Sequence, residues 1–206
     1  WDPVNQKTLL FGGWRYQIPQ APLNDTWLWT GSIWTQMTAP LSPPARLFHS
    51  MATDPVRQRV VLFGGSAPGT APFLDTWEWD GSQWSLMQPL TRSPGVHHRA
   101  PMAWNPVTQR LALFGSVGSS VVPLLPVEEW NGLDWMQRTG AGGLQASGLD
   151  YGFAVTDPAG LGVRVYGWRF TGLPSPTAHQ WLWNGTHLTA LTTTTPMPTT
   201  LTVPVP

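Results

Sequence analysis

The stretch DPVRQRVVLFGG, residues 54–65, joins a turn, an apolar strand and a pair of glycines. The aspartate-proline pair predicts a turn, because proline fixes φ and the aspartate side chain can accept hydrogen bonds from the backbone that follows it. Residues 59–63 form a continuous β-branched and aromatic run, which is typical of a strand covered on both faces. The glycines at 64–65 end that strand, so the stretch predicts a turn followed by a buried strand.

The same features return along the chain at spacings of 51 or 52 residues. The turn pairs begin at Asp2, Asp54, Asn105 and Asp157, and the aromatic-glycine pairs begin at Phe11, Phe63, Phe114 and Tyr166. A second marker follows each of them: Trp29 with Trp34, Trp79 with Trp84, Trp130 with Trp135, and Trp183 with Leu188. A period near 50 with aromatic and glycine markers predicts a β-propeller with one blade in each repeat.

The second repeat predicts four strands, at residues 49–53, 59–63, 76–79 and 83–86. Asp80-Gly81 predicts a two-residue type I′ hairpin, in which both central residues have positive φ. The same signal recurs at Thr30-Gly31, Asn131-Gly132 and Asn184-Gly185. No stretch keeps a 3.6-residue periodicity, so we expect an all-β fold of four blades, each a four-stranded antiparallel meander, with almost no helix.

On these residues the chain resembles the kelch-repeat β-propeller family, in the form of the galactose-oxidase-like central domain. The resemblance is carried by the glycine pair after the second strand and by Asp25-Thr26-Trp27 and Asp75-Thr76-Trp77. It extends to about residue 191 and weakens later, where Leu188 replaces the last tryptophan. Some propellers of this kind oxidise sugars at a copper site that uses a cysteine-crosslinked tyrosine. The chain has no cysteine, so the resemblance implies the scaffold without the copper site.

The repeats divide the chain at about 1–40, 41–91, 92–142 and 143–191, followed by a Thr- and Pro-rich tail at 192–206. The first repeat lacks its first strand. Two explanations remain open: residues 199–206 close the first blade as a strand, or the tail is a linker and the four blades form part of a larger ring. Pro204 and Pro206 cannot donate to a strand ladder, which favours an edge or linker role.

Composition excludes several classes of function. With 11 basic and 11 acidic residues the formal net charge is zero, so no basic surface is available for nucleic acid. No apolar run is long enough to cross a bilayer, so we expect no membrane insertion. The lack of cysteine excludes disulfides, thiolate zinc sites and a cysteine nucleophile. Low charge, many tryptophans and the Thr/Pro tail favour an extracellular or cell-surface location.

The predicted meander places short, repetitive turns at one end of the molecule and long, variable connections at the other, which is how binding surfaces are usually built. The candidate ligand-binding residues at that end are Trp14, Arg15, Tyr16, Arg46, His49, His97, His98, Trp168 and Arg169. Trp14 and Trp168 lie outside the strand positions that explain the other tryptophans, which we expect to be structural. Arg46 and His49 resemble the family's inner-strand signature, so we favour hydrogen bonding between blades for them.

We expect no metal or cofactor. His97 and His98 are adjacent, so in a strand their side chains point in opposite directions, and no acidic cluster adjoins them. No catalytic residues emerge, because Asp25, Asp54, Asp75 and Asp157 fall at repeated turn or strand-edge positions, and the sequence does not reveal what Glu128 and Glu129 contact. The favoured function is therefore a non-catalytic binding or scaffolding propeller that recognises a protein or a glycan. The alternatives are a carbohydrate-active enzyme domain or a purely structural module of a larger extracellular protein.

Overall fold

The computed structural model describes residues 1–91, 93–94, 100–115, 127–138, 151–169 and 177–191, which contain strands and no helix. It follows that no helix long and apolar enough to span a membrane occurs in these residues. The strands are β1 (Thr8–Arg15), β2 (Ala21–Trp29), β3 (Trp34–Met37), β4 (Ser50–Asp54), β5 (Arg59–Phe63), β6 (Thr76–Trp79), β7 (Trp84–Met87), β8 (Met102–Asn105), β9 (Arg110–Phe114), β10 (Val127–Trp130), β11 (Trp135–Arg138), β12 (Tyr151–Thr156), β13 (Val163–Arg169), β14 (Thr177–Trp183) and β15 (Leu188–Ala190).

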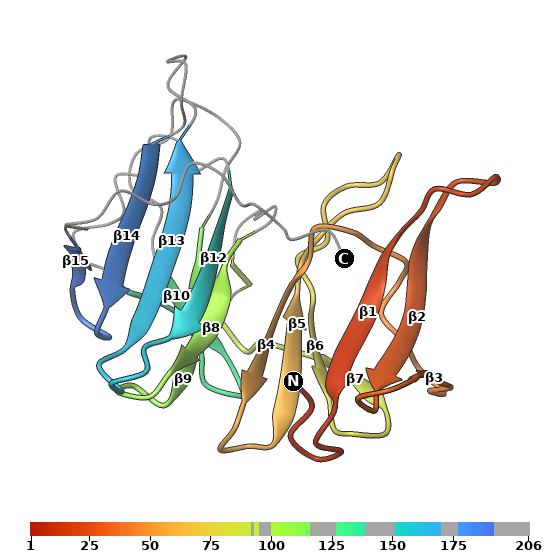
Figure 1. The fold of residues 1–206 in the computed structure, drawn as a ribbon, viewed down its shortest axis with the longest axis horizontal. Coiled ribbons are helices and arrows are strands. Elements are labelled where there is room, and N and C mark those ends of the chain that lie inside the picture. The colour runs from red at the N-terminus through yellow and green to blue at the C-terminus, as the bar shows by residue number, and fades with distance from the viewer. Residues whose placement is uncertain (92, 95–99, 116–126, 139–150, 170–176, 192–206) are drawn as a thin grey trace, which may run out of the picture.

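These strands form four antiparallel sheets that stand side by side in chain order (Figure 1). Sheet one has the order β1-β2-β3, and sheets two, three and four have four strands each, β4 to β7, β8 to β11 and β12 to β15. The all-β expectation is confirmed, and sheet one has three strands, as the incomplete first repeat predicts. The arrangement is consistent with a propeller-like fold, and no strand among the described residues joins two sheets into a closed ring.

The aspartate-proline turns form as predicted. In the turn between β4 and β5, Asp54 Oδ1 accepts hydrogen bonds from the backbone N–H groups of Val56 at 3.0 Å and Arg57 at 2.9 Å. Gln58 then takes a positive φ of 55° to reverse the chain. Asp2 makes the same bonds to Val4 and Asn5. Each carboxylate is buried and its Oδ1 caps its own turn, which explains why these acids repeat.

The type I′ prediction for the β6–β7 hairpin is wrong. Trp79 and Trp84 form the last strand pair, so the loop between them has four residues, and only Gly81 has positive φ, at 100°. Asp80 Oδ1 instead accepts hydrogen bonds from the backbone N–H groups of Ser82 at 2.8 Å and Gln83 at 2.9 Å. The side chain therefore closes the turn, in the way that Asx turns do.

The core lies between neighbouring sheets. Because side chains alternate across a strand, Val60 and Leu62 of β5 pack against Leu9 and Phe11 of sheet one, while the intervening Val61 packs toward sheet three. Sheets three and four pack in the same way through Ala112, Phe114, Val163, Val165 and Trp183. The continuous apolar run in each second strand thus buries both of its faces, as the sequence predicts.

Indole hydrogen bonds connect each sheet to the one before it. The Nε1–H of Trp79 donates to Asp2 Oδ2 at 2.8 Å, and that of Trp130 donates to Glu78 Oε1 at 2.8 Å. Trp183 donates to Glu129 Oε1 at 3.2 Å. A repeated tryptophan therefore meets a buried acid of the preceding repeat at all three described interfaces.

A second tryptophan position donates to a threonine. Trp84 Nε1–H reaches Thr26 Oγ1 at 2.9 Å, and Trp135 Nε1–H reaches Thr76 Oγ1 at 2.8 Å. At the interface between sheets three and four both partners differ. Val127 occupies the threonine position and Leu188 occupies the tryptophan position. These two pack within one apolar cluster, so a hydrogen-bonded pair is replaced by an apolar pair.

The outer face of sheet one differs from the interior. Trp34 is 45% exposed, whereas its counterpart Trp84 is 2% exposed. Leu10 is likewise 45% exposed, whereas Leu62 is fully buried. Trp1 is also exposed. The expectation that the repeat tryptophans are buried is therefore wrong for Trp1 and Trp34, because no described sheet packs on that side.

Candidate functional site

The beginnings of three strands define one end of the molecule. Ser50 pairs with Phe63, and Met102 pairs with Leu113, so β4 and β8 start where β5 and β9 end. The strand β12 starts beside the end of β13 in the same way. In Figure 1 these beginnings lie at the top with the described connections β1–β2 and β5–β6, and the β4–β5 turn lies at the bottom. For the connections described, the predicted division into a long-connection end and a short-turn end is confirmed.

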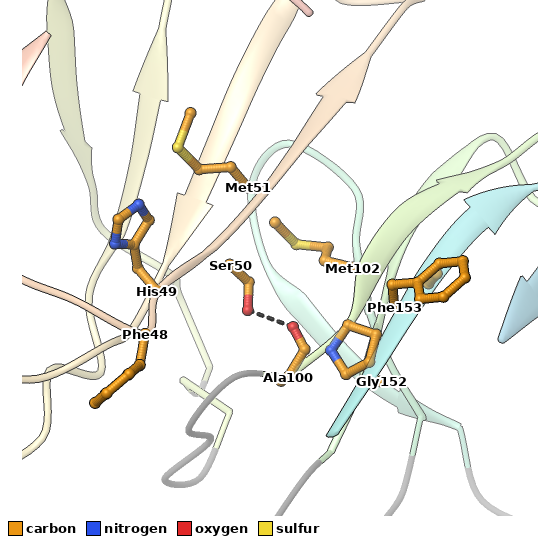
Figure 2. A pocket seen from close by; sticks show the side chains of 10 residues that line it. Phe48, His49, Ser50, Met51, Ala100, Met102, Gly152 and Phe153 are labelled. Atoms are coloured by element: carbon orange, nitrogen blue, oxygen red, sulfur yellow. Dashed lines mark hydrogen bonds between the residues drawn. The ribbon is translucent and has the colours of Figure 1, made fainter. Parts of the chain in front are cut away.

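A cavity of about 360 Å³ opens among these strand beginnings (Figure 2). Its lining consists of Phe48, His49, Ser50, Met51, Ala100, Pro101, Met102, Gly152, Phe153 and Ala154. Three consecutive sheets therefore contribute to it, each through its first strand or the residues just before that strand. Most of the lining side chains are apolar, and the polar side chains come from His49 and Ser50 alone.

His49 is the titratable side chain of the cavity. Its ring lies 5.5 Å from the ring of Phe11 in an edge-on arrangement, and its buried Nδ1 has no hydrogen-bond partner among the described residues. Burial, assisted by repulsion from Arg46, lowers the pKa of His49 to about 4. The imidazole is consequently neutral at neutral pH and offers the cavity a hydrogen-bonding group without charge.

Two features hold the cavity walls together. The Ser50 hydroxyl donates to the backbone carbonyl of Ala100 at 2.5 Å and so links β4 to the approach of β8. At Gly152 an added Cβ would lie 2.7 Å from the carbonyl oxygen of Tyr166 and 3.3 Å from the Pro101 ring. Glycine at that position therefore lets β12 approach its neighbours closely.

Arg46 is fully buried and does not line the cavity. Its NH1 and NH2 groups donate to the two carboxylate oxygens of Asp75 at 2.6 and 2.8 Å, NH1 also donates to the Gly64 carbonyl at 2.8 Å, and the guanidinium lies over the Phe73 ring. The backbone of Arg46 bonds to Gly13 and Leu23 of sheet one. The expected bonding between blades is thus made by the Arg46 backbone, while its side chain bonds within its own sheet.

The pair fixes the charge of Asp75. Burial raises the pKa of this carboxyl, but the hydrogen bonds from Arg46 and Trp77 and the charge of Arg46 outweigh it and hold the pKa below its ordinary value. Arg46 and Asp75 are therefore an ion pair at neutral pH. The pair lies just before β4 and links that segment to the end of β5 through the Gly64 carbonyl.

The other candidate residues lie apart from the cavity lining. Trp14 and Arg15 end β1, and Tyr16 follows them in the β1–β2 hairpin, where it is 80% exposed. Arg15 Nε donates to the Pro19 carbonyl at 3.2 Å within that hairpin. The backbone of Trp168 and Arg169 ends β13, and their side chains, like the whole of His97 and His98, lie outside the described part.

Sequence reasoning named His49 but missed the apolar lining, in particular Phe48, Met51, Met102 and Phe153. Their position in the repeat could have indicated them, because these residues lie in or just before the first strand of a repeat. Their apolar character gave no such signal, since strands of a sheet core have the same composition.

Two buried acids, Glu129 and Glu78, are bonded to structural partners. Glu129, for which the sequence suggested no partner, accepts hydrogen bonds from Arg138 at 2.5 and 2.7 Å and from the Trp183 indole. Glu78 accepts from both Arg57 and the Trp130 indole. In the part of the chain that is described, no three His, Asp or Glu side chains gather in a group that could hold a metal ion.

Comparisons with known proteins add information on the fold. No family model matches the sequence, and no curated protein matches it. Among solved structures, one titled "Structure of YjhT" superposes with a TM-score of 0.56 at 12% sequence identity. The match covers 83% of this chain and 53% of YjhT, so the chain spans about half of that protein's length. At this identity the similarity concerns the fold alone.

Proposed function

We propose that this chain is a kelch-like β-propeller module of four blades, sheets one to four, that binds a protein and catalyses no reaction. The repeat spacing, the repeated strand registers and the indole contacts between consecutive sheets support the propeller assignment. An extracellular or cell-surface location remains part of the proposal, on the composition of the chain.

The observation that carries the proposal is the cavity at the long-connection end. Its volume of about 360 Å³ suits one large apolar side chain of a partner, and buried anchors of this kind contribute most of the affinity at protein interfaces. Met51 and Met102 present apolar atoms to it. Because the lining side chains other than His49 and Ser50 carry no polar atoms, an apolar side chain of a protein is the better occupant.

The arrangement of acids supports binding over hydrolysis. Glycoside hydrolysis requires two carboxyl groups that face a substrate across several ångströms. Among the described residues, Asp75, Glu78 and Glu129 are instead held by arginine and tryptophan donors. Moving any of them toward a substrate would leave a buried arginine or indole donor unpaired, at a cost of about 1–3 kcal/mol for each lost bond.

The test is a selection from a displayed library of random linear peptides, followed by anisotropy titrations of the enriched peptides. We expect peptides with a common apolar residue, whose affinity falls about tenfold or more, near 1.4 kcal/mol, in the variant Phe48→Asn/Phe153→Ser. Both positions are partly exposed, and asparagine tolerates the positive φ of 62° at Phe48.

Tyr16→Ser is the matched control, because it removes an exposed aromatic ring outside the cavity lining. Unchanged affinity in Tyr16→Ser together with loss in the cavity variant supports the proposal. Failure to enrich any peptide, or loss only in Tyr16→Ser, contradicts it.

A glycan is the second candidate, on the position of Trp14 and Tyr16. Trp14 is half-buried at the end of β1, and the exposed Tyr16 follows two residues later, so two aromatic rings lie near one hairpin and could stack on sugar rings. A glycan array with the wild type and a Trp14→Ala/Trp168→Ala variant tests this. Saccharide binding that is lost in the variant would favour the glycan over the protein partner.

A further inference from the structure

The hairpin between β14 and β15 closes with the sequence Asn-Gly-Thr-His, residues 184–187. Asn184 Oδ1 accepts hydrogen bonds from the backbone N–H of Thr186 at 2.9 Å, from the Thr186 hydroxyl at 3.0 Å and from the backbone N–H of His187 at 2.7 Å. These three residues are exposed, so water reaches the turn. The donors draw electron density toward Oδ1 and leave the Asn184 amide carbon, Cγ, more open to attack by a nucleophile.

The Thr186 hydroxyl is held in the direction that serves Asn184. His187 Nδ1 lies 2.9 Å from Thr186 Oγ1. Because an amide oxygen carries no proton, the Thr186 hydroxyl is the donor to Asn184, and its oxygen is left to accept. The proton between threonine and histidine is therefore on His187 Nδ1, and the imidazole fixes the orientation of the hydroxyl.

The position after Asn184 requires glycine. Gly185 has a φ of 97°, and an added Cβ would lie 2.3 Å from Thr108 Cγ2. Without a side chain, the nitrogen of this residue is an unhindered nucleophile. The Gly185 N–H donates no hydrogen bond in the described structure. The fold thus places a free, unhindered amide nitrogen where its attack on Asn184 Cγ closes a five-membered ring.

The equivalent turn in sheet two shows that this geometry stabilises negative charge. Asp80 occupies the place of Asn184, and its Oδ1 accepts bonds from the Ser82 backbone at 2.8 Å, the Ser82 hydroxyl at 2.8 Å and the Gln83 backbone at 2.9 Å. Burial raises the pKa of Asp80, but the bonds from Gln83 and Ser82 outweigh it and hold the pKa below its ordinary value. The same donors at Asn184 stabilise the charge that develops on Oδ1 when a nucleophile adds to Cγ, in the manner of an oxyanion hole.

We propose that Asn184-Gly185 is a self-catalysed modification site, at which the turn converts its own asparagine through a succinimide into an aspartyl residue. The Gly185 nitrogen loses its proton and bonds to Asn184 Cγ, the Cγ–Nδ2 bond breaks, and ammonia leaves with that proton. Water then opens the succinimide at either carbonyl, which gives aspartate or isoaspartate. Aspartate restores the kind of turn that Asp80 forms and adds one negative charge to a chain whose formal net charge is zero. The site is separate from the cavity and independent of the proposed function.

A second Asn-Gly pair gives an internal comparison. Asn131 is also exposed, and its Oδ1 accepts hydrogen bonds from the backbone N–H groups of Leu133 and Asp134 at 2.8 Å each. Gly132 has nearly the same φ as Gly185, at 98°. Leu133 occupies the position of Thr186, so the hydroxyl donor is missing. Asn131 should therefore react more slowly than its counterpart in sheet four.

The test follows deamidation at both sites in one sample of the full, folded chain at neutral pH, by peptide mapping and mass spectrometry over time. We expect Asn184 to react about tenfold faster than Asn131, because one more donor stabilises the developing oxyanion. In concentrated urea the two sites should react at similar rates, since both then depend mainly on the glycine that follows. Isoelectric focusing should show the added negative charge.

The matched variants change only the hydroxyl donor. Thr186→Val keeps the side-chain shape and should slow Asn184 to the rate of Asn131. Thr186→Ser should keep the wild-type rate, because Ser82 makes the corresponding bond to Asp80. A rate at Asn184 equal to or below that at Asn131 in the folded chain overturns the proposal. So does an unchanged rate in Thr186→Val, a loss in Thr186→Ser, or a preference for Asn184 that persists in urea. The two-site comparison uses the wild type alone, so it stands even where a variant folds poorly.

Discussion

At the scale of single residues, identical positions in the repeat have different chemistry because their neighbours differ. Asp25 and Asp75 share the motif Asp-Thr-Trp, yet only Asp75 pairs with an arginine. Arg46 is fully buried, and its charge is balanced by Asp75. A buried charge whose partner is removed costs several kcal/mol, whereas the removal of an unpaired charge costs little.

This contrast yields a stability prediction. Asp75→Asn should lower the free energy of unfolding by about 3 kcal/mol, because the Arg46 charge stays buried without its anion. Asp25→Asn should lower it by less than about 1 kcal/mol, because the asparagine oxygen can still accept the Trp27 indole bond. Urea unfolding of both variants measures this. Equal losses would mean that Asp25 also holds a cationic partner in solution.

His49 should make stability depend on pH. Its folded-state pKa is about 4 and its ordinary value is 6.5, so between these values the unfolded chain binds a proton that the folded chain does not. The free energy of unfolding therefore falls as the pH is lowered from 6.5 toward 4, by about 2 kcal/mol at pH 4.5. The difference between wild type and His49→Gln, measured at pH 7 and pH 4.5, isolates this effect. A difference that is independent of pH would contradict it.

At the scale of elements, the sheets are joined by paired positions rather than by single residues. Thr76 accepts the indole hydrogen bond of Trp135, and Val127 packs in one cluster with Leu188. A threonine without the indole, or an indole without the threonine, would bury an unsatisfied polar group. The replacement of both partners at the third interface avoids that cost.

Exchanging threonine for valine at one interface, or valine for threonine at the other, should therefore destabilise the fold. Thr76→Val leaves the Trp135 N–H buried without an acceptor, and Val127→Thr buries a hydroxyl opposite Leu188, so each should cost about 1–2 kcal/mol. Denaturant unfolding of the two variants measures the effect. If Thr76→Val were neutral or stabilising, side-chain hydrophobicity alone would explain these positions, and the pairing interpretation would fail.

At the scale of the whole molecule, the array of sheets has two ends. The outer face of sheet one exposes Leu10 and Trp34, and sheet four exposes Phe153 and Val155. Interior positions of the same repeat are covered on both faces. The contribution of a side chain to stability should therefore depend on which sheet carries it.

Leu62→Ala should lower the free energy of unfolding by about 3 kcal/mol, because it opens a cavity in a closely packed interface. The equivalent substitution Leu10→Ala should lower it by less than about 1 kcal/mol, because that side chain is already 45% exposed. Urea unfolding at low protein concentration compares the two. Similar losses would show that the face of sheet one is covered in solution, by ring closure or by another copy of the chain.

Much of the fold could be predicted from the sequence because it depends on local chemistry. The turn acids, the two-sided apolar strands and the period of 51 or 52 residues each act through neighbouring residues or through alternation along a strand. The turn at Asp80-Gly81 shows the limit of such signals. The same dipeptide permits a tight turn or a side-chain-closed loop of four residues, and the Trp79–Trp84 pairing selects the second.

The sequence alone determined that the chain is all-β and that its turn, strand and tryptophan markers return four times. Only the tertiary structure decided which residues form the cavity, that Arg46 is buried in an ion pair with Asp75, and that Asp25 lacks the arginine that Asp75 has. The reason is that these properties arise between segments many residues apart. Repeats of similar sequence become different when one face packs against a neighbouring sheet and the equivalent face does not.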